Sequence, residues 1–212
     1  STYANNTAGC NVAIGLDAGN CVSSGTFNVL MGSNAGKTVT TGSDNIALGQ
    51  CSMGTGAVTG NNNIVMGQTA GKALTSGSQN VFLGRYAGQL NTTLDGNVYI
   101  GDHAGKLNVA ANNVAIGNGA GGKLTGAADN VYLGYNTGEG LASGTRTGSQ
   151  NVALGKYALA EITTGGKNVV LGCSAGNKIT SGADNIALGQ LALGTGTVTG
   201  NCNIALGSRA GT

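Results

Sequence analysis

The chain has 212 residues and a formal net charge of only +2; 41 residues are glycine, and proline and tryptophan are absent. Collagen is excluded because a triple helix needs glycine at every third residue together with abundant proline, and long helices are excluded because each interior glycine costs about 1 kcal/mol. No run of about 20 apolar residues is present, so we expect no insertion into a membrane.

A five-residue motif recurs along the chain: asparagine, a β-branched residue, a variable apolar residue, an aliphatic residue and glycine. The copies are most often 17 residues apart, and positions are numbered here from the asparagine. Position 2 is always Val or Ile, position 4 is Ile, Leu or Met, and position 5 is always Gly. The copies begin at Asn11, Asn28, Asn45, Asn63, Asn80, Asn97, Asn113, Asn130, Asn151, Asn168, Asn185 and Asn203.

Each copy predicts a short strand that ends in a turn, because β-branched residues favour strands and glycine allows positive φ or a close backbone approach. In chain order these strands lie within 11–15, 28–32, 45–49, 63–67, 80–84, 97–101, 113–117, 130–134, 151–155, 168–172, 185–189 and 203–207. Position 12 is often aliphatic, as within 72–75, and predicts a second short strand in each repeat.

Two strands and two turns in 17 residues make one coil of a solenoid. We therefore predict an all-β fold, a parallel β-solenoid (β-roll) of about twelve coils, which stacked ~4.8 Å apart would form a rod of about 55 Å. The repeat runs through 1–212 and predicts a single domain, with an irregular longer coil at 130–150. In register, the asparagines at position 1 would form a ladder of side-chain amides along the stack.

Position 3 is apolar in every copy, and in a strand it points to the face opposite positions 2 and 4. Strands that are apolar on both faces are normally covered on both. We therefore predict that one face lines the coil interior and that position 3 forms an interface between copies of the chain, the alternative being that its many alanines tolerate water. The larger residues at position 3 are Leu30, Val65, Phe82, Tyr99, Tyr132 and Val170.

The form Asn-Val-Ala-Ile-Gly occurs unchanged at 11–15 and 113–117, with close variants at 45–49, 151–155 and 203–207. It resembles the head repeat of trimeric autotransporter adhesins of the YadA type, and it is similar to the Asn-x-Ala-Ile-Gly repeats of phage and marine viral tail fibres. The resemblance covers essentially the whole chain. It implies a left-handed β-roll, a homotrimer, and a place on a cell surface or virion where the partner is a cell-surface glycan or receptor.

Catalytic and metal chemistry have little support in the sequence. His103 is the only histidine, so a histidine-based triad or a multi-histidine metal site cannot form within one chain. The five cysteines lack metal-ligand spacing, although Cys10 and Cys21 could meet at the first turn. We expect no enzyme activity, no cofactor and no metal.

Five lysines form a loose basic edge that is too sparse for nucleic-acid binding and is better explained as a solvated edge. They are Lys37, Lys72, Lys106, Lys123 and Lys178.

The leading functional hypothesis is therefore a non-enzymatic structural or adhesive rod segment of an extracellular fibre, which assembles through an apolar strand face. An alternative is a self-assembling head-to-tail filament, because Ser1 and Thr212 fall at nearly the same phase of the repeat. A second alternative is ice binding through a row of threonines at position 13. These threonines are Thr40, Thr75, Thr92, Thr125, Thr163 and Thr180.

Overall fold

The structure is a computed structural model in which residues 9–140 and 146–211 are described; Ser1 and Thr212, on which the head-to-tail alternative depends, lie outside these ranges. The described residues contain twelve parallel three-residue strands and no helix, and they form a β-solenoid. The chain consists of two compact units, unit 1 (Ser1–Lys106) and unit 2 (Leu107–Thr212).

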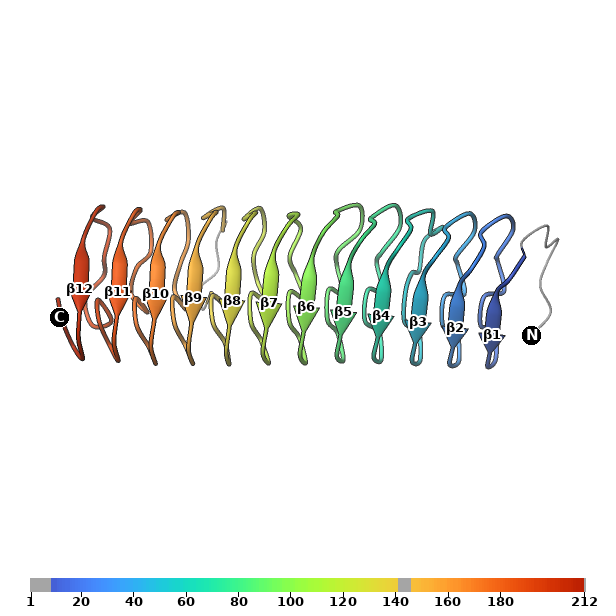
Figure 1. Cartoon of the computed structure of the whole chain (residues 1–212), viewed down its shortest axis with the longest axis horizontal. Coiled ribbons are helices and arrows are strands. Elements are labelled where there is room, and N and C mark those ends of the chain that lie inside the picture. Colours follow the sequence, from blue (N-terminus) through green and yellow to red (C-terminus); the bar gives the residue numbers. More distant parts are fainter. Residues whose placement is uncertain (1–8, 141–145, 212) are drawn as a thin grey trace. The chain divides into compact units, whose positions relative to one another are not determined.

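In each unit the strands lie side by side in chain order, one strand per repeat (Figure 1). Unit 1 contains β1 (Val12–Ile14), β2 (Val29–Met31), β3 (Ile46–Leu48), β4 (Ile64–Met66), β5 (Val81–Leu83) and β6 (Val98–Ile100). Unit 2 contains β7 (Val114–Ile116), β8 (Val131–Leu133), β9 (Val152–Leu154), β10 (Val169–Leu171), β11 (Ile186–Leu188) and β12 (Ile204–Leu206).

Neighbouring strands pair in register, so that each motif position stacks on the same position of the next coil. Val29 pairs with Ile46, for example, and Leu30 pairs with Ala47. The longer repeat keeps this register, because β8 and β9 still pair position for position although 21 residues separate Asn130 from Asn151.

Among the described residues, the second strand that was predicted for each repeat does not form; position 12 of the repeat that begins at Asn130 lies outside them. Residues 72–75 make turns, although the amide N–H of Ala73 and that of Thr75 still donate to carbonyls of the next coil. Around position 12 only two isolated bridges occur among the described residues, Val39 with Val58 and Ile179 with Val198. Each coil therefore consists of one short strand and a long series of turns.

Position 3 faces the interior of the solenoid, which overturns its predicted role as an interface. Together with the alanines at position 8 and the aliphatic residues at position 12, it makes up the core. The reason is the alternation of the strand: the asparagine at position 1 is buried, so position 3, two residues on, points the same way. The six residues predicted to meet another chain are all fully buried within a single chain: Leu30, Val65, Phe82, Tyr99, Tyr132 and Val170.

The core residues at positions 3 and 9 vary inversely in size. Where position 3 is large, position 9 is glycine, and a Cβ at Gly36 would lie 2.5 Å from Cδ2 of Leu30. Where position 9 is large, as at Met53, position 3 is alanine, here Ala47, and both residues are fully buried. Leu159 and Leu193 likewise face alanines at position 3. In nine of the twelve coils one larger side chain, from position 3 or from position 9, therefore fills the interior, and in the coils that begin at Asn11, Asn113 and Asn203 both positions are small.

Glycine at position 5 forms the turn that ends each strand. At Gly67 the φ is 135°, a backbone conformation that L side chains rarely adopt. A Cβ there would also lie 2.5 Å from the carbonyl oxygen of Gly84, the equivalent glycine of the next coil. Positive φ and close stacking thus both require glycine, as the sequence predicts.

Candidate functional site: the outer strand face and its edges

The asparagines at position 1 form a continuous ladder within each unit. The Asn63 Oδ1 accepts the amide N–H and the Nδ2–H of Asn80, both from the next coil, at 3.0 and 3.1 Å. The same contacts join Asn130 to Asn113 in unit 2, at 3.0 and 3.1 Å. Apart from Asn11 and Asn203, these side chains are buried, so the ladder is an internal structural element.

The same asparagines also close their own coils. The Nδ2 of Asn63 donates to the Gly77 carbonyl, 14 residues later in the same coil, at 2.9 Å. Asn168 donates in the same way to Gly182, at 3.0 Å. Because one carboxamide holds both its own coil and the next, these residues fix the shape of the solenoid, and all but Asn11 and Asn203 are shielded from solvent.

Positions 2 and 4 form two parallel rows of aliphatic side chains on the outside of the strands, and together we name these rows the apolar face. The rows comprise Val12, Val29, Ile46, Ile64, Val81 and Val98 with Ile14, Met31, Leu48, Met66, Leu83 and Ile100 in unit 1. In unit 2 they comprise Val114, Val131, Val152, Val169, Ile186 and Ile204 with Ile116, Leu133, Leu154, Leu171, Leu188 and Leu206. None of these side chains is buried.

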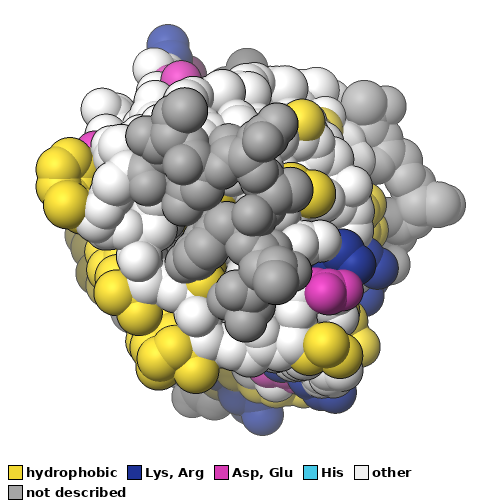
Figure 2. All heavy atoms as spheres, turned by 90° about the vertical axis from the view of Figure 1, so that its right-hand side faces the viewer, with side chains coloured by type: hydrophobic (Ala, Val, Ile, Leu, Met, Phe, Trp, Pro, Cys, Tyr) yellow, Lys and Arg dark blue, Asp and Glu magenta, His cyan; other side chains and the backbone are white. Residues whose placement is uncertain are grey.

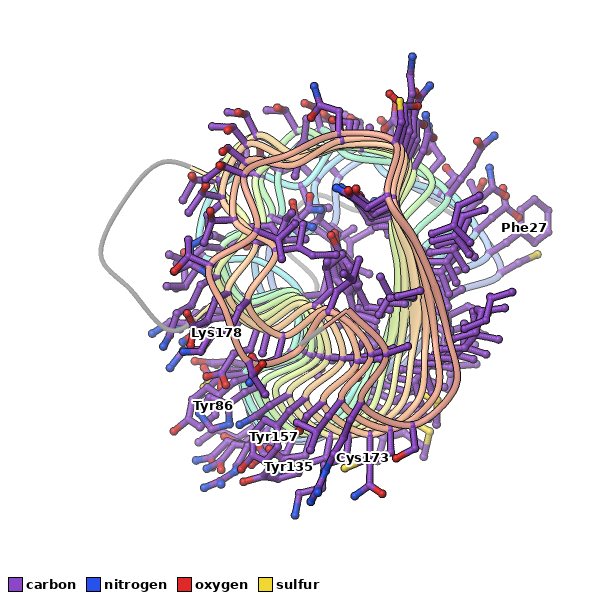
Figure 3. The ribbon with its side chains drawn as sticks, turned by 90° about the vertical axis from the view of Figure 1, so that its left-hand side faces the viewer. Phe27, Tyr86, Tyr135, Tyr157, Cys173 and Lys178 are labelled. Atoms are coloured by element: carbon purple, nitrogen blue, oxygen red, sulfur yellow. The ribbon has the colours of Figure 1, made fainter. Side chains whose placement is uncertain are left out.

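The apolar face is visible from both ends of the molecule. Looking onto unit 1, hydrophobic side chains gather along one side (Figure 2). Looking onto unit 2, two fans of all-carbon side chains project outward from the strand side (Figure 3). Met66 and Leu171 are each 38 % exposed. The predicted interface at position 3 lies inside the coil, and the aliphatic residues of positions 2 and 4 are the ones that face outward.

Position 6 begins a polar edge beside the apolar face, and coils are joined there by ion pairs. Arg85 makes two hydrogen bonds of 3.0 Å to the Asp102 carboxylate in the next coil, and His103 Nδ1 lies 3.0 Å from the same group. The hydrogen bond from Arg85 holds the pKa of Asp102 below its usual range. Lys37 Nζ donates to Asp17 at 2.9 Å.

The predicted basic edge is therefore partly neutralised. Lys123 lies 3.4 Å from Glu139, and Lys178 contacts Glu161.

Aromatic side chains cluster on this edge at two places. In unit 1, Tyr86 packs against His103 with ring centroids 4.9 Å apart, and Arg85 and Lys106 lie over the Tyr86 ring at 5.2 and 5.0 Å. In unit 2, Tyr135 and Tyr157 meet edge to face at 5.4 Å, with Lys156 over both rings. These tyrosines project outward in Figure 3. Unlike the apolar face, this edge changes its chemistry from coil to coil.

A half-open cavity of about 250 Å³ lies in unit 1 at position 10. It opens because Gly54 stands at a position where the coils on either side carry Lys37 and Lys72. No Asp or Glu lines it, and its free thiol, Cys51, has no partner cysteine. It is lined by Asn34, Lys37, Thr38, Cys51, Gly54, Thr55 and Lys72.

Three of the six threonines at position 13 donate their hydroxyl protons to carbonyls of the next coil. The Thr40 hydroxyl donates to the Val58 carbonyl at 3.2 Å, Thr75 to Thr92 at 3.1 Å and Thr163 to Thr180 at 3.0 Å. A hydroxyl whose proton already bonds to the next coil offers less to an ice lattice. The row therefore has a structural use that the sequence pattern did not indicate.

The five cysteines are all free, and Cys10 and Cys21 are both exposed and unpaired. Within residues 9–140 and 146–211, no three His, Cys, Asp or Glu side chains gather in a way that could hold a metal ion. In the same ranges no helix has the length and apolarity needed to cross a membrane.

No protein-family model, no curated protein and no solved structure matches this chain. The functional proposal therefore depends on the residues and their geometry.

Proposed function

We propose that the chain is a non-enzymatic structural or adhesive rod segment of an extracellular fibre, either a viral tail fibre or a surface adhesin. The observation that supports this most directly is the repeated joint between coils. Within each unit, each coil is held to the next by parallel strand hydrogen bonds and by the asparagine ladder, both in register. A tensile load along the stack would be divided among the same set of bonds in every coil.

The edge at positions 6 and 7 supplies the adhesive part of the proposal. Its aromatic rings and cations, such as Tyr135 with Lys156, are partly exposed and differ between coils. Exposed polar and aromatic side chains on a rigid scaffold are the usual place for binding contacts. A cell-surface glycan or receptor would be recognised there, while the invariant positions maintain the scaffold.

Immunogold electron microscopy on the source cells or virions tests this function. Gold is expected along fibres on the outer surface, and gold confined to the cell interior would contradict the proposal. Negative-stain images of the purified chain provide a second observation. Open-ended filaments that grow without any added partner would favour the head-to-tail alternative.

A further inference from the structure

The tyrosines that the structure describes outside the core all lie on the edge at positions 6 and 7, and each has a cation over its ring. They are Tyr86 in unit 1 and Tyr135 and Tyr157 in unit 2. The chain has only ten Lys and Arg among 212 residues, so scattered cations would rarely coincide with all three of these rings. The pairing of ring and cation therefore points to a shared use of this edge.

The two aromatic clusters differ in their carboxylates. In unit 1, Arg85 at position 6 binds the carboxylate of Asp102, which occupies position 6 of the next coil. In unit 2, Lys156 occupies position 6, and the same position of the next coil is Cys173, which carries no carboxylate. Among the described residues no Asp or Glu lies at ion-pair distance from Lys156. Its ammonium group therefore contacts two tyrosine rings and can bind a carboxylate from outside the chain.

We infer that Tyr135, Lys156 and Tyr157 form a binding site for the carboxylate-bearing sugar of an acidic glycan. The inference rests on the proposed function and deepens it, because it names the chemical class that this edge would recognise. Lys156 would bind the carboxylate, and the tyrosine rings would pack on the C–H groups of the sugar ring. The tyrosine hydroxyls can exchange hydrogen bonds with the sugar hydroxyls.

The distances within the cluster fit this class of ligand. The Lys156 Nζ lies 5.6 Å from the centre of the Tyr135 ring and 5.2 Å from that of Tyr157, and the two ring centres are 5.4 Å apart. Uronic and sialic acids carry the carboxylate directly on the sugar ring, so a carboxylate held by Nζ brings that ring onto the tyrosines. Lys156 and Tyr135 are exposed, and both tyrosines point away from the solenoid (Figure 3).

The charges around the cluster also favour an anion. Partial burial, followed by Tyr135 and the negative charge of Glu139, raises the pKa of Tyr157, so its hydroxyl stays protonated at neutral pH and can donate. Glu139 is itself offset by Lys123, at 3.4 Å. The charge of Lys156 therefore leaves the cluster with a net positive charge.

Other acidic partners fit the cluster less well. A nucleic acid is held by several cations along its phosphates, and this cluster supplies one. An acidic peptide carries its carboxylates on flexible side chains and brings no sugar ring to the tyrosines. An oligonucleotide and an acidic peptide are therefore included in the test as competing ligands.

Saturation-transfer-difference NMR of the full chain tests the inference, with three acidic probes: sialyllactose, hyaluronan tetrasaccharide and trigalacturonic acid. Irradiation of the aromatic protons should transfer signal to at least one probe, at the sugar ring that bears the carboxylate. Lactose is the neutral part of sialyllactose. Where sialyllactose is the probe that binds, lactose should bind at least about ten-fold more weakly.

Variants in the cluster separate charge from ring. Lys156→Gln should raise the dissociation constant of the bound acidic probe about ten-fold, whereas Lys156→Arg keeps the charge and should stay within about three-fold. Tyr157→Ala should also weaken binding about ten-fold. The matched control is Lys167→Gln, because Lys167 is an exposed lysine of unit 2 that takes no part in the cation–ring contacts of the described residues. Far-UV circular dichroism checks that each variant keeps its fold.

Several outcomes would overturn the inference. One is binding of none of the three acidic probes, and another is binding of lactose as tight as that of sialyllactose. Equal losses in Lys167→Gln and Lys156→Gln would also contradict it. Tighter binding of oligothymidylate or of a polyglutamate peptide than of every acidic sugar would assign the cluster to that class of partner instead.

The two proposals fail separately. Fibres labelled by gold together with a chain that binds no acidic sugar would remove the glycan site and leave the fibre function. A chain that binds an acidic sugar through Lys156, but is labelled only inside the cell, would do the reverse.

Discussion

At the scale of single residues, the asparagine of position 1 has the most demanding environment. In most coils its carboxamide is buried, donates within its own coil and accepts two N–H groups from the next. Leaving a buried donor or acceptor unpaired costs about 1–3 kcal/mol for each group. Few other side chains have both the donors and the acceptor that this position needs.

Removing one rung of the ladder should therefore be costly. Asn130→Ala leaves both N–H groups of Asn151 that point at it without their acceptor, and we expect a loss of about 3 kcal/mol in the free energy of unfolding. Urea denaturation measures this. Asn118 is an exposed asparagine of the same unit, and Asn118→Ala should change stability by less than about 0.5 kcal/mol. Equal effects of the two substitutions would show that the ladder is not important for stability.

Because a large side chain occurs at either position 3 or position 9 but not at both, substitutions at these two positions should have coupled effects on stability. Leu30→Ala should destabilise unit 1 by about 2–5 kcal/mol, because it leaves a cavity. Gly36→Met should also destabilise, because its Cβ would meet Leu30 at 2.5 Å. The double variant reproduces the Ala47 and Met53 pair of the next coil. Its loss in the free energy of unfolding should therefore be smaller than the sum of the two single losses by at least about 1 kcal/mol. Simple additivity of the two single losses in a double-mutant cycle would contradict this packing.

Asn91 breaks the apolar pattern of position 12. Its side chain is fully buried, and neither its Oδ1 nor its Nδ2 has a hydrogen-bond partner. Leu74, one coil earlier, occupies the same position and is fully buried as well. Asn91→Leu should therefore raise the melting temperature, with a stabilisation of about 1–3 kcal/mol. A lower melting temperature would indicate that the carboxamide has an unseen partner, such as a bound water.

At the scale of elements, much of the coil could be predicted from the sequence. Twelve motifs give the number, the place and the parallel stacking of the strands, and Gly67 illustrates why each strand ends where it does. The second strand was predicted wrongly, because an aliphatic position such as Leu74 looks the same in a strand as in a turn that points inward. Tertiary packing, and not local preference, decides that case.

The main error in the predicted site was the assignment of which strand face points into the coil. All of positions 2, 3 and 4 are apolar, so hydrophobicity could not indicate which face is inside. Two further signals could have done so. A buried ladder at Asn63 requires that Val65 points inward too, and the inverse sizes of Leu30 with Gly36 and Ala47 with Met53 show that positions 3 and 9 share one space. Polar and steric constraints thus indicate which face of the strand points inward, whereas the hydrophobic pattern does not.

Ion pairs between coils should make a small, pH-dependent contribution. The pKa of Asp102 is lowered in the folded state by Arg85, so its contribution is present above the unfolded value of about 3.9 and is lost as pH falls through the lower folded pKa. Because the pair is partly exposed, we expect less than about 1 kcal/mol at neutral pH. Urea denaturation of Asp102→Asn should show a deficit at pH 7 that disappears in acid. Asp129→Asn is the control, and an equal deficit there would contradict the assignment.

At the scale of the whole molecule, each strand contacts only the neighbouring strands of its own unit. Stability in such a stack is close to a sum of coil terms and nearest-neighbour terms. Leu30→Ala should therefore accelerate amide hydrogen exchange in β1–β3 and leave β10–β12 unchanged within error. Uniform acceleration along the chain would indicate that the solenoid unfolds as one cooperative body.

The size exchange inside the coils has a consequence for how this chain can change. A large side chain can pass from position 3 to position 9, as between Leu30 and Met53, while Val29 and Ile46 on the outside remain aliphatic and paired. Interior substitutions are thereby insulated from the outer strand face. Packing inside the coils and the chemistry of the outer strand face are governed by separate residues, so evolution or engineering can adjust one without disturbing the other.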